Sequence, residues 1–184
     1  HFGIDNSSKK EMVEYVKILD KILGVACVSL FQNLDNPLRR QYYGLAGEYR
    51  LPNHGLEYRT LTNAWACHPT IMYIVFELAR KAIAMKQNKL EALWDSSEEE
   101  TIECINNCDV NMAQEILKLN ETLFKNILHS FCYQNQQIVD SVYNMFLNGV
   151  ETVIKNPFDI IGNWKNETYA SRIYNYVPNF LTKK

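Results

Sequence analysis

The stretch RRQYYGLAGEYRLPNHGLEYRTLTNAWACHP, residues 39–69, decides the fold of this chain. Residues 45–50 and 56–62 are typical of strands because each is short, carries aromatic or branched side chains, and is bounded by turn-forming residues. The link between them, 51–55, contains Pro, Asn and Gly, which favour a turn. We therefore expect an antiparallel pair of strands.

The predicted strands each carry a carboxylate followed two residues later by an arginine. Residues i and i+2 of a strand face the same side, so Glu57 should lie beside Arg59, and Glu48 beside Arg50. Carboxylate oxygens suit Mg²⁺, and the arginine fork matches phosphate oxygens. The pattern predicts a site for Mg²⁺ and phosphate. The alternative is a surface ion-pair ladder, which contributes only about 0–1 kcal/mol.

Helical patterns surround this segment. Apolar residues from Met12 to Leu30 recur at three- and four-residue spacing, which predicts a helix with one core face that ends near Asn33. Pro69 is typical of a helix start, and SSEEE at 96–100 of another. The expected helices then lie near 98–107, 111–131 and 135–154. These patterns predict an α+β fold with a predominantly helical C-terminal region.

Composition narrows the function classes. The chain has 184 residues, a net charge of −2 and a hydrophobic content of 47%, so it can form a core and lacks the bulk positive charge of a nucleic-acid binder. No apolar run is long enough to span a membrane, and we expect no signal peptide. The five cysteines follow no disulfide or zinc spacing. We expect a cytoplasmic protein without nucleic-acid or membrane partners.

Other polar and aromatic residues have more than one interpretation. His54 lies in the predicted turn and is expected to be exposed, while His68 precedes Pro69 and can cap the helix. His129 is expected at a core boundary. The aromatic residues near the strands are either a wall for adenine or ordinary packing against the strand pair; they are Tyr42, Tyr43, Tyr49, Tyr58 and Trp65.

Residues 1–70 resemble the phage-type amidoligases, which are carboxylate–amine ligases with a glutamine synthetase-like catalytic fold. The resemblance is carried, in this order, by HFG (1–3), RR (39–40), YGLAGEYR (43–50), GLEYR (55–59) and NAW (63–65). It implies that residues 1–70 form the C-terminal part of a catalytic sheet. Residues 71–184 would then be a helical region packed on that sheet in the same domain.

The resemblance also implies roles for individual residues. Glu57 would be a metal ligand, and Arg59 would contact the acid substrate or its acyl phosphate. Arg50 would act with Arg59 in catalysis and would also bind ATP phosphates. The implied cofactors are ATP and Mg²⁺, and the implied reaction forms an amide or isopeptide bond through an acyl phosphate.

Three further residues take roles from the same resemblance. One of Arg39 and Arg40 would bind ATP phosphates, and His1 would correspond to the second histidine of a His-x-His pair that touches the nucleotide. The family's other metal-binding glutamates lie on earlier strands. We therefore expect the remaining ligands on a segment upstream of His1, or on a second copy of the chain.

The implied substrates are a carboxylate and an amine, each a small molecule or a peptide. If the chain comes from a phage, its expected location is the host cytoplasm. Two other functions are compatible with the sequence. One is a non-catalytic viral structural or interaction protein that retains the fold. The other is a different phosphotransferase, which would use the same phosphate-binding residues.

Overall fold

The computed structural model describes residues 1–4, 8–132 and 135–166. Residues 6 and 7 of the predicted first cap, and residues 167–184 of the predicted helical region, lie outside this part. Within it the protein is mostly helical and carries one small antiparallel sheet, which confirms the α+β class. No helix in the described ranges is both long and apolar enough to cross a membrane.

The first half of the described chain contains a long helical stretch, a short helix and two strands. Its elements are α1 (Lys9–Leu19), a π-helical turn (Asp20–Gly24), α2 (Val25–Phe31), a 3₁₀ turn (Gln32–Leu34), α3 (Pro37–Arg40), β1 (Tyr49–Arg50), β2 (Glu57–Tyr58) and a 3₁₀ helix (Asn63–Ala66).

The second half is helical throughout. Its elements are α4 (Pro69–Gln87), a 3₁₀ turn (Glu91–Leu93), α5 (Glu98–Asn107), α6 (Val110–Leu119), α7 (Glu121–His129), α8 (Gln136–Asn148), a 3₁₀ turn (Val150–Thr152) and α9 (Ile160–Asn166).

Side-chain caps explain where several helices begin. Ser8 and Glu11 form a capping box at α1, because the Ser8 hydroxyl accepts from the Glu11 amide while the Glu11 carboxylate accepts from the Ser8 amide. Ser97 and Glu100 do the same at α5. At α4 the His68 ring accepts the Thr70 amide at 3.1 Å, which confirms His68 as a cap.

The predicted helix over 111–131 is wrong in one respect, because α6 and α7 are separate. Asn120 lies at the break, and its side-chain amide donates to the Asp95 carbonyl at 2.9 Å while its side-chain oxygen accepts the Asp95 amide at 2.7 Å. A buried amide that pairs with backbone outside the helix favours a break at that residue. The helix predicted over 135–154 also ends early, at Asn148, because Gly149 has φ +89°.

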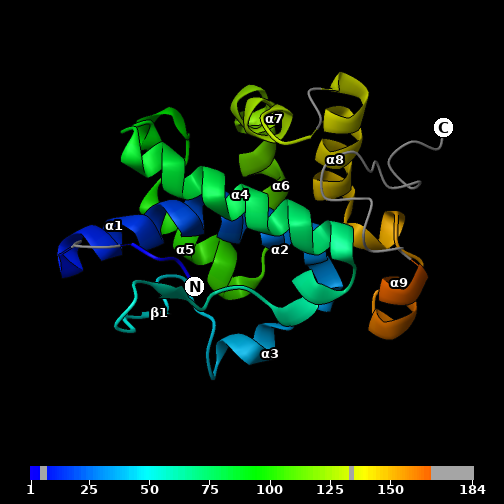
Figure 1. Cartoon of the computed structure of the whole chain (residues 1–184), viewed down its shortest axis with the longest axis horizontal. Helices are drawn as coiled ribbons and strands as arrows, with labels where there is room; N and C mark the ends of the chain where they lie inside the picture. Colours follow the sequence, from blue (N-terminus) through cyan, green and yellow to red (C-terminus); the bar gives the residue numbers. More distant parts are fainter. Residues whose placement is uncertain (5–7, 133–134, 167–184) are drawn as a thin grey trace.

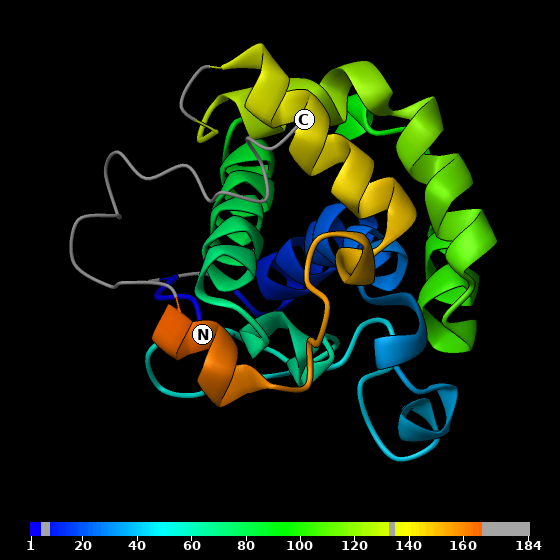
Figure 2. The same cartoon turned by 90° about the vertical axis from the view of Figure 1, so that its right-hand side faces the viewer.

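The core lies between the long N-terminal helical stretch and the later helices. Figures 1 and 2 show α4 running beside α1, where it also packs on the π-helical turn, with α6 and α8 against α2. The predicted core face of the first helix is confirmed, since its apolar positions are buried. The largest fully buried side chains are Phe31, Phe124, Phe146, Leu19, Ile22, Leu23, Leu30, Leu56, Ile71, Leu78, Ile105 and Leu117.

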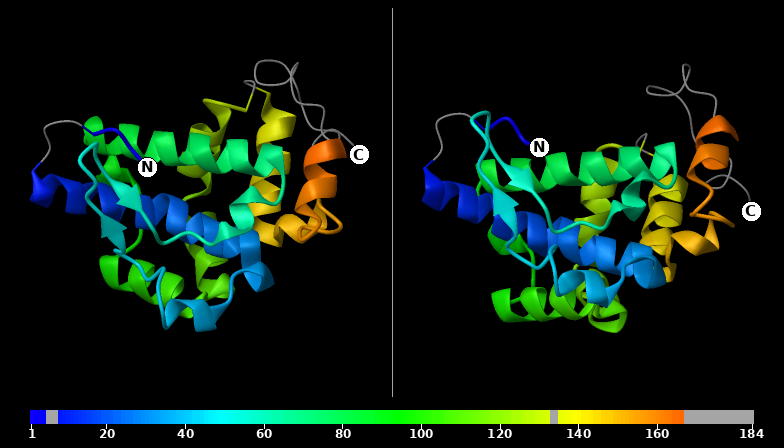
Figure 3. Two further views of the ribbon diagram at one scale, coloured as in Figure 1. Left: turned by 60° about the horizontal axis from the view of Figure 1, so that its bottom comes forward. Right: turned by 90° about the horizontal axis from the view of Figure 1, so that it is seen from below.

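The two strands form a short ribbon rather than the longer strands predicted. Tyr49 pairs with Tyr58 and Arg50 with Glu57, and Phe2 extends the sheet by a bridge to Leu56. The first strand is short because Gly44 and Gly47 have positive φ values of 90° and 80°, which bend the chain before Tyr49. Figure 3 shows the ribbon at the opposite end of the molecule from α9.

A buried ion cluster attaches this ribbon to the end of the helical stretch. Asp35 pairs with Arg40 at 2.6 Å and with Arg39 at 3.3 Å, and both guanidinium groups donate to the Thr60 carbonyl, at 2.7 and 3.0 Å. The side chains of Asp35 and Arg40 are only 2% and 4% exposed. The cluster therefore fixes residues 35–40 against the strand segment.

We expect Asp35→Ala to lower the free energy of unfolding by about 3–5 kcal/mol, because it leaves two arginines without their carboxylate partner in a buried place. Urea unfolding followed by circular dichroism measures this change. The matched control is Glu77→Ala, which breaks the pair between Glu77 and the 68% exposed Arg80 on α4 and should cost about 1 kcal/mol or less. Equal losses in the two variants would contradict the structural role of Asp35.

Candidate active site

The candidate site lies on the outer face of β2. The Arg59 Nε atom is 3.5 Å from Glu57 Oε1, and His1 Nε2 is 4.0 Å from Glu57 Oε2. The His1 and His54 rings stack with centroids 5.4 Å apart, and His1 Nδ1 lies 3.1 Å from His54 Nε2. Three of the predicted site residues therefore meet, together with His54, which sequence reasoning placed only in an exposed loop.

Strand alternation explains this grouping. Glu57 and Arg59 point to the same side, as predicted, while the intervening Tyr58 points inward to the helices. Arg50 stands directly opposite Glu57 in the strand register and is exposed. Residues opposite each other in an antiparallel pair have Cβ atoms about 4.5–5.5 Å apart. Arg50 is therefore next to the site and free to reach a ligand, since no hydrogen bond or ion pair holds its side chain within the described residues.

Glu48 does not join Arg50. Its carboxylate instead accepts the backbone amide of Gly44, which stabilises the turn before β1. The predicted pair of Glu48 and Arg50 is therefore not formed. Glu48 stabilises the turn, and only Arg50 lies beside the site.

The two consecutive arginines lie behind the site. Arg40 is directed into the interior, where Asp35 and Thr60 occupy its guanidinium. Burial is the largest single effect and would lower its pKa, but the charges and hydrogen bonds of Asp35 and Cys108 together raise the pKa. Arg39 is 16% exposed, and its guanidinium lies 5.1 Å from the centroid of the Tyr43 ring. The same ring is 5.6 Å from the guanidinium of Arg59.

The described residues contain no group of three or more His, Cys, Asp or Glu side chains that could hold a metal ion. Glu57 is the candidate ligand at the site, because its carboxylate oxygens suit Mg²⁺. Mg²⁺ commonly takes one or two protein ligands and completes its shell with phosphate oxygens and water. The arrangement therefore fits Mg²⁺ that arrives with a phosphate, but does not form a closed protein cage.

A model of the family phage phiEco32-like COOH.NH2 ligase-type 2 matches residues 1–166. The chain belongs to this family. Its description names a carboxylate–amine ligase and thus an enzyme, and it confirms the expected phage-type amidoligase. The match extends from residue 1 to the end of α9, whereas the motifs above cover only residues 1–70. Comparison with curated proteins gave no match, and comparison with solved structures gave none either.

In this ligase-family chain the buried carboxylate of Asp20 binds the inward face of the strand segment. The sequence analysis did not predict this role. Asp20 is 5% exposed in the π-helical turn and accepts from the Gly47 amide and the Tyr58 hydroxyl, each at 2.6 Å, and from the Thr60 hydroxyl at 3.3 Å. The signal was present, because Asp20 is four residues after Val16 and so lies on the predicted core face. An acid on such a face needs internal partners.

Burial dominates the electrostatics of this contact. It raises the pKa of Asp20 to about 6, although the hydrogen bonds from Tyr58, Gly47 and Thr60 act in the opposite direction. Burial also raises the pKa of Tyr58 well above its usual value, and the neighbouring Asp20 charge adds to this shift. Tyr58 therefore stays protonated and remains a donor to Asp20.

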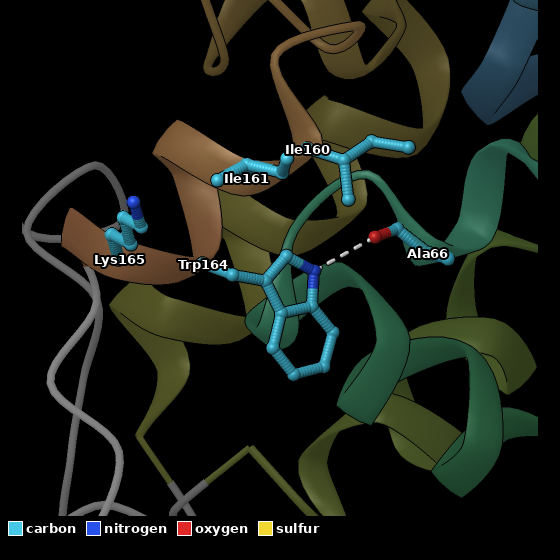
Figure 4. A pocket seen from close by; sticks show the side chains of 5 residues that line it. All are labelled: Ala66, Ile160, Ile161, Trp164 and Lys165. Atoms are coloured by element: carbon cyan, nitrogen blue, oxygen red, sulfur yellow. Dashed lines mark hydrogen bonds between the residues drawn. The ribbon is translucent and has the colours of Figure 1, made fainter.

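An apolar cavity of the ligase-family chain lies away from this site. Figure 4 shows Ile160, Ile161 and Trp164 of α9 beside Ala66, where they line a cavity of about 440 Å³. Trp164 Nε1 donates to the Ala66 carbonyl at 2.9 Å. This contact attaches α9 to the segment that follows the strands. Glu57 and Arg59 do not line the cavity, so the chemistry of the site is not placed there.

The raised pKa of Asp20 predicts a pH-dependent stability. In the folded protein the Asp20 carboxyl has a pKa of about 6, whereas an Asp in the unfolded chain has a pKa of about 3.9. The native state therefore holds more protons between these values, and the contribution of Asp20 to stability falls as the pH rises from about 4 to about 6. Across this range the difference in unfolding free energy between wild type and Asp20→Asn should change by about 2–3 kcal/mol.

Urea titrations of both proteins at pH 4, 5, 6 and 7 measure this difference. The variant lacks the titrating group, so its profile should lack the loss of stability that Asp20 causes in wild type as the pH rises from about 4 to about 6. Parallel profiles over the whole range would show that Asp20 titrates alike in the folded and unfolded chains.

Proposed function

We propose that this chain takes part in ATP- and Mg²⁺-dependent carboxylate–amine ligation through an acyl phosphate, on a glutamine synthetase-like fold. Membership of the ligase family supports the reaction class. The observation that carries the finer proposal is the grouping of Glu57, Arg59 and His1 on one face, with the exposed Arg50 opposite Glu57.

The reaction has two steps. A carboxylate oxygen of the acid attacks the γ-phosphorus of ATP, the bond to the β,γ-bridging oxygen breaks, and ADP leaves. The amine then attacks the carbonyl carbon of the acyl phosphate, loses a proton and releases inorganic phosphate as the amide forms. The phosphoryl group carries its charge on oxygens throughout, so catalysis depends on positioning and on charge stabilisation.

The proposed roles follow from position and exposure. Arg59 keeps its Nε toward Glu57, which leaves its terminal NH groups for the acyl phosphate. Arg50 is exposed and binds ATP phosphates. Glu57 would hold Mg²⁺ together with phosphate oxygens, and His1, 4.0 Å from Glu57, would contact the nucleotide. When bound, Mg²⁺ neutralises the charge that develops on those oxygens.

Arg39 and Arg40 take a different part from the one that the family resemblance implied. The guanidinium of Arg40 is enclosed by Asp35 and Thr60, so we assign it to the fold. Arg39 shares these partners and reaches the site only through the ring of Tyr43. The phosphate contacts are therefore assigned to Arg50 and Arg59.

The proposal is tested by calorimetric titration of the chain with Mg-ATP. We expect wild type to bind and Arg50→Ala to weaken binding about 10- to 100-fold, since a charge-assisted hydrogen bond contributes about 1.5–3 kcal/mol. Within residues 1–4, 8–132 and 135–166 the Arg50 side chain makes no hydrogen bond or ion pair, so its loss should leave the melting temperature unchanged. Glu57→Gln should lower the affinity for Mg-ATP more than for ATP without metal.

Arg80→Ala is the matched control, because Arg80 is also an exposed arginine but lies on α4 and pairs with Glu77. Its affinity for Mg-ATP should equal that of wild type. If Arg50→Ala and Arg80→Ala bind alike, the phosphate role of Arg50 is wrong. If wild type with an unchanged fold binds no Mg-ATP, the ligase proposal gives way to a non-catalytic interaction protein on the same fold.

A further inference from the structure

We propose that Tyr43 is a positioning residue for Arg59, and that its aromatic ring holds the arginine where a phosphate can be bound. The inference rests on the proposed function, because it takes Arg59 as the phosphate contact. Its basis is a continuous series of contacts from the buried Asp35 through Arg39 and Tyr43 to Arg59 and Glu57.

The inner end of the series is rigid. Arg39 donates to Asp35 through Nε and one terminal nitrogen, each at 3.3 Å, and to the Thr60 carbonyl at 3.0 Å. Asp35 is itself buried and held by Arg40. The guanidinium of Arg39 therefore has a fixed place, and the ring of Tyr43 lies with its centroid 5.1 Å from it. A cation at this distance from an aromatic ring attracts it.

The backbone turn after α3 brings the ring to this place. The Tyr43 amide donates to the Arg39 carbonyl at 3.0 Å, which continues the turn of α3. Gly44 follows with φ +90°, a conformation that favours glycine, and its amide donates to Glu48. A Cβ atom at Gly44 would collide with the guanidinium of Arg39. The sequence YG at 43–44 thus allows the close approach of the turn to Arg39.

At the outer end of the series, the guanidinium of Arg59 needs a contact that fixes its position. Arg59 has a long side chain, and its ion pair with Glu57 is only moderately close, at 3.5 Å. The ring of Tyr43 gives the guanidinium of Arg59 a second contact at 5.6 Å and does not use any of its N–H donors. The terminal NH groups of Arg59 make no hydrogen bond within the described residues. They are therefore held in place and still available to an anion.

The contact is made by the ring and not by the hydroxyl, since the Tyr43 hydroxyl makes no hydrogen bond within the described part of the chain. Tyr43→Phe should therefore keep the function, and Tyr43→Leu should lose it. The neighbouring Tyr42 provides a matched control, because it is 86% exposed and contacts no ring or cation in the described ranges. Tyr42→Leu removes the same group from the next position in the loop.

The first measurement follows the Arg59 Nε–H resonance by NMR, assigned by its loss in Arg59→Lys. We expect the ring current of residue 43 to displace this resonance in wild type, Tyr43→Phe and Tyr42→Leu, and the displacement to disappear in Tyr43→Leu. An unchanged resonance in Tyr43→Leu would overturn the proposal, because the ring would then not contact Arg59 in solution.

The second measurement is the affinity for acetyl phosphate, the simplest acyl phosphate, in the presence of Mg²⁺. Tyr43→Leu should bind about three- to tenfold more weakly than wild type, which is the range expected for the loss of a cation–π contact. Tyr43→Phe and Tyr42→Leu should bind like wild type. Equal weakening in Tyr43→Phe and Tyr43→Leu would overturn the role of the ring and transfer it to the hydroxyl.

The two measurements separate this proposal from the proposed function. If wild type shows the displaced resonance but binds no acetyl phosphate, the contact stands and the phosphate role of Arg59 is wrong. If acetyl phosphate binds and Tyr43→Leu changes neither its affinity nor the resonance, the proposed function survives and the role of Tyr43 is wrong. Melting temperatures of the variants show whether a loss of fold accounts for any change.

Discussion

Two buried carboxylates, Asp20 and Asp35, must find partners inside the protein, and the strand segment is built around that requirement. Both act on Thr60. Its hydroxyl donates to Asp20, and its carbonyl accepts from the arginines that Asp35 holds. Buried charge is tolerated only where hydrogen bonds and counter-charges surround it. The ribbon of β1 and β2 is too short to be stable by itself, so these contacts keep it on the helices.

The same contacts separate the two faces of the ribbon. Tyr58 points inward to Asp20 and stays protonated, while Glu57 and Arg59 on either side of it point outward. On the inward face, Asp20 accepts hydrogen bonds from Tyr58, Gly47 and Thr60. The outward face keeps a carboxylate, an imidazole and two arginines near solvent, which is the arrangement proposed to bind phosphate and Mg²⁺. A preorganised site requires side chains that are held in place by the fold and hydrogen-bond donors that remain available to the ligand.

Positive charge is divided in a similar way. Four arginines occur between residues 39 and 59, but they do not act as one cluster. Arg40 belongs to the interior, Arg39 links the interior to Tyr43, and Arg50 and Arg59 stand at the site. One residue type thus serves as a structural counter-ion, as a support for an aromatic ring and as a proposed ligand group. Burial and partners distinguish these uses.

Local patterns were sufficient for the parts of the fold that depend on local physics. The core face of the first helix, the helix starts at Pro69 and Glu98, and the shared side of Glu57 and Arg59 all follow from periodicity, capping and strand alternation. The break at Asn120 does not follow from such patterns. It depends on a hydrogen-bonded pairing with Asp95, 25 residues away, that a local sequence window does not contain.

The sequence by itself determined the chemical groups of this protein: the AGEYR and GLEYR motifs, the arginine pair and the membership of a carboxylate–amine ligase family that they indicate. Only the tertiary structure decided how those groups are used. In it Arg40 is buried, the rings of His54 and His1 stack, and the ring of Tyr43 lies between the guanidinium groups of Arg39 and Arg59. The physical reason is that spacing sets which side of an element a residue occupies, whereas burial and pairing depend on distant segments that fold against it.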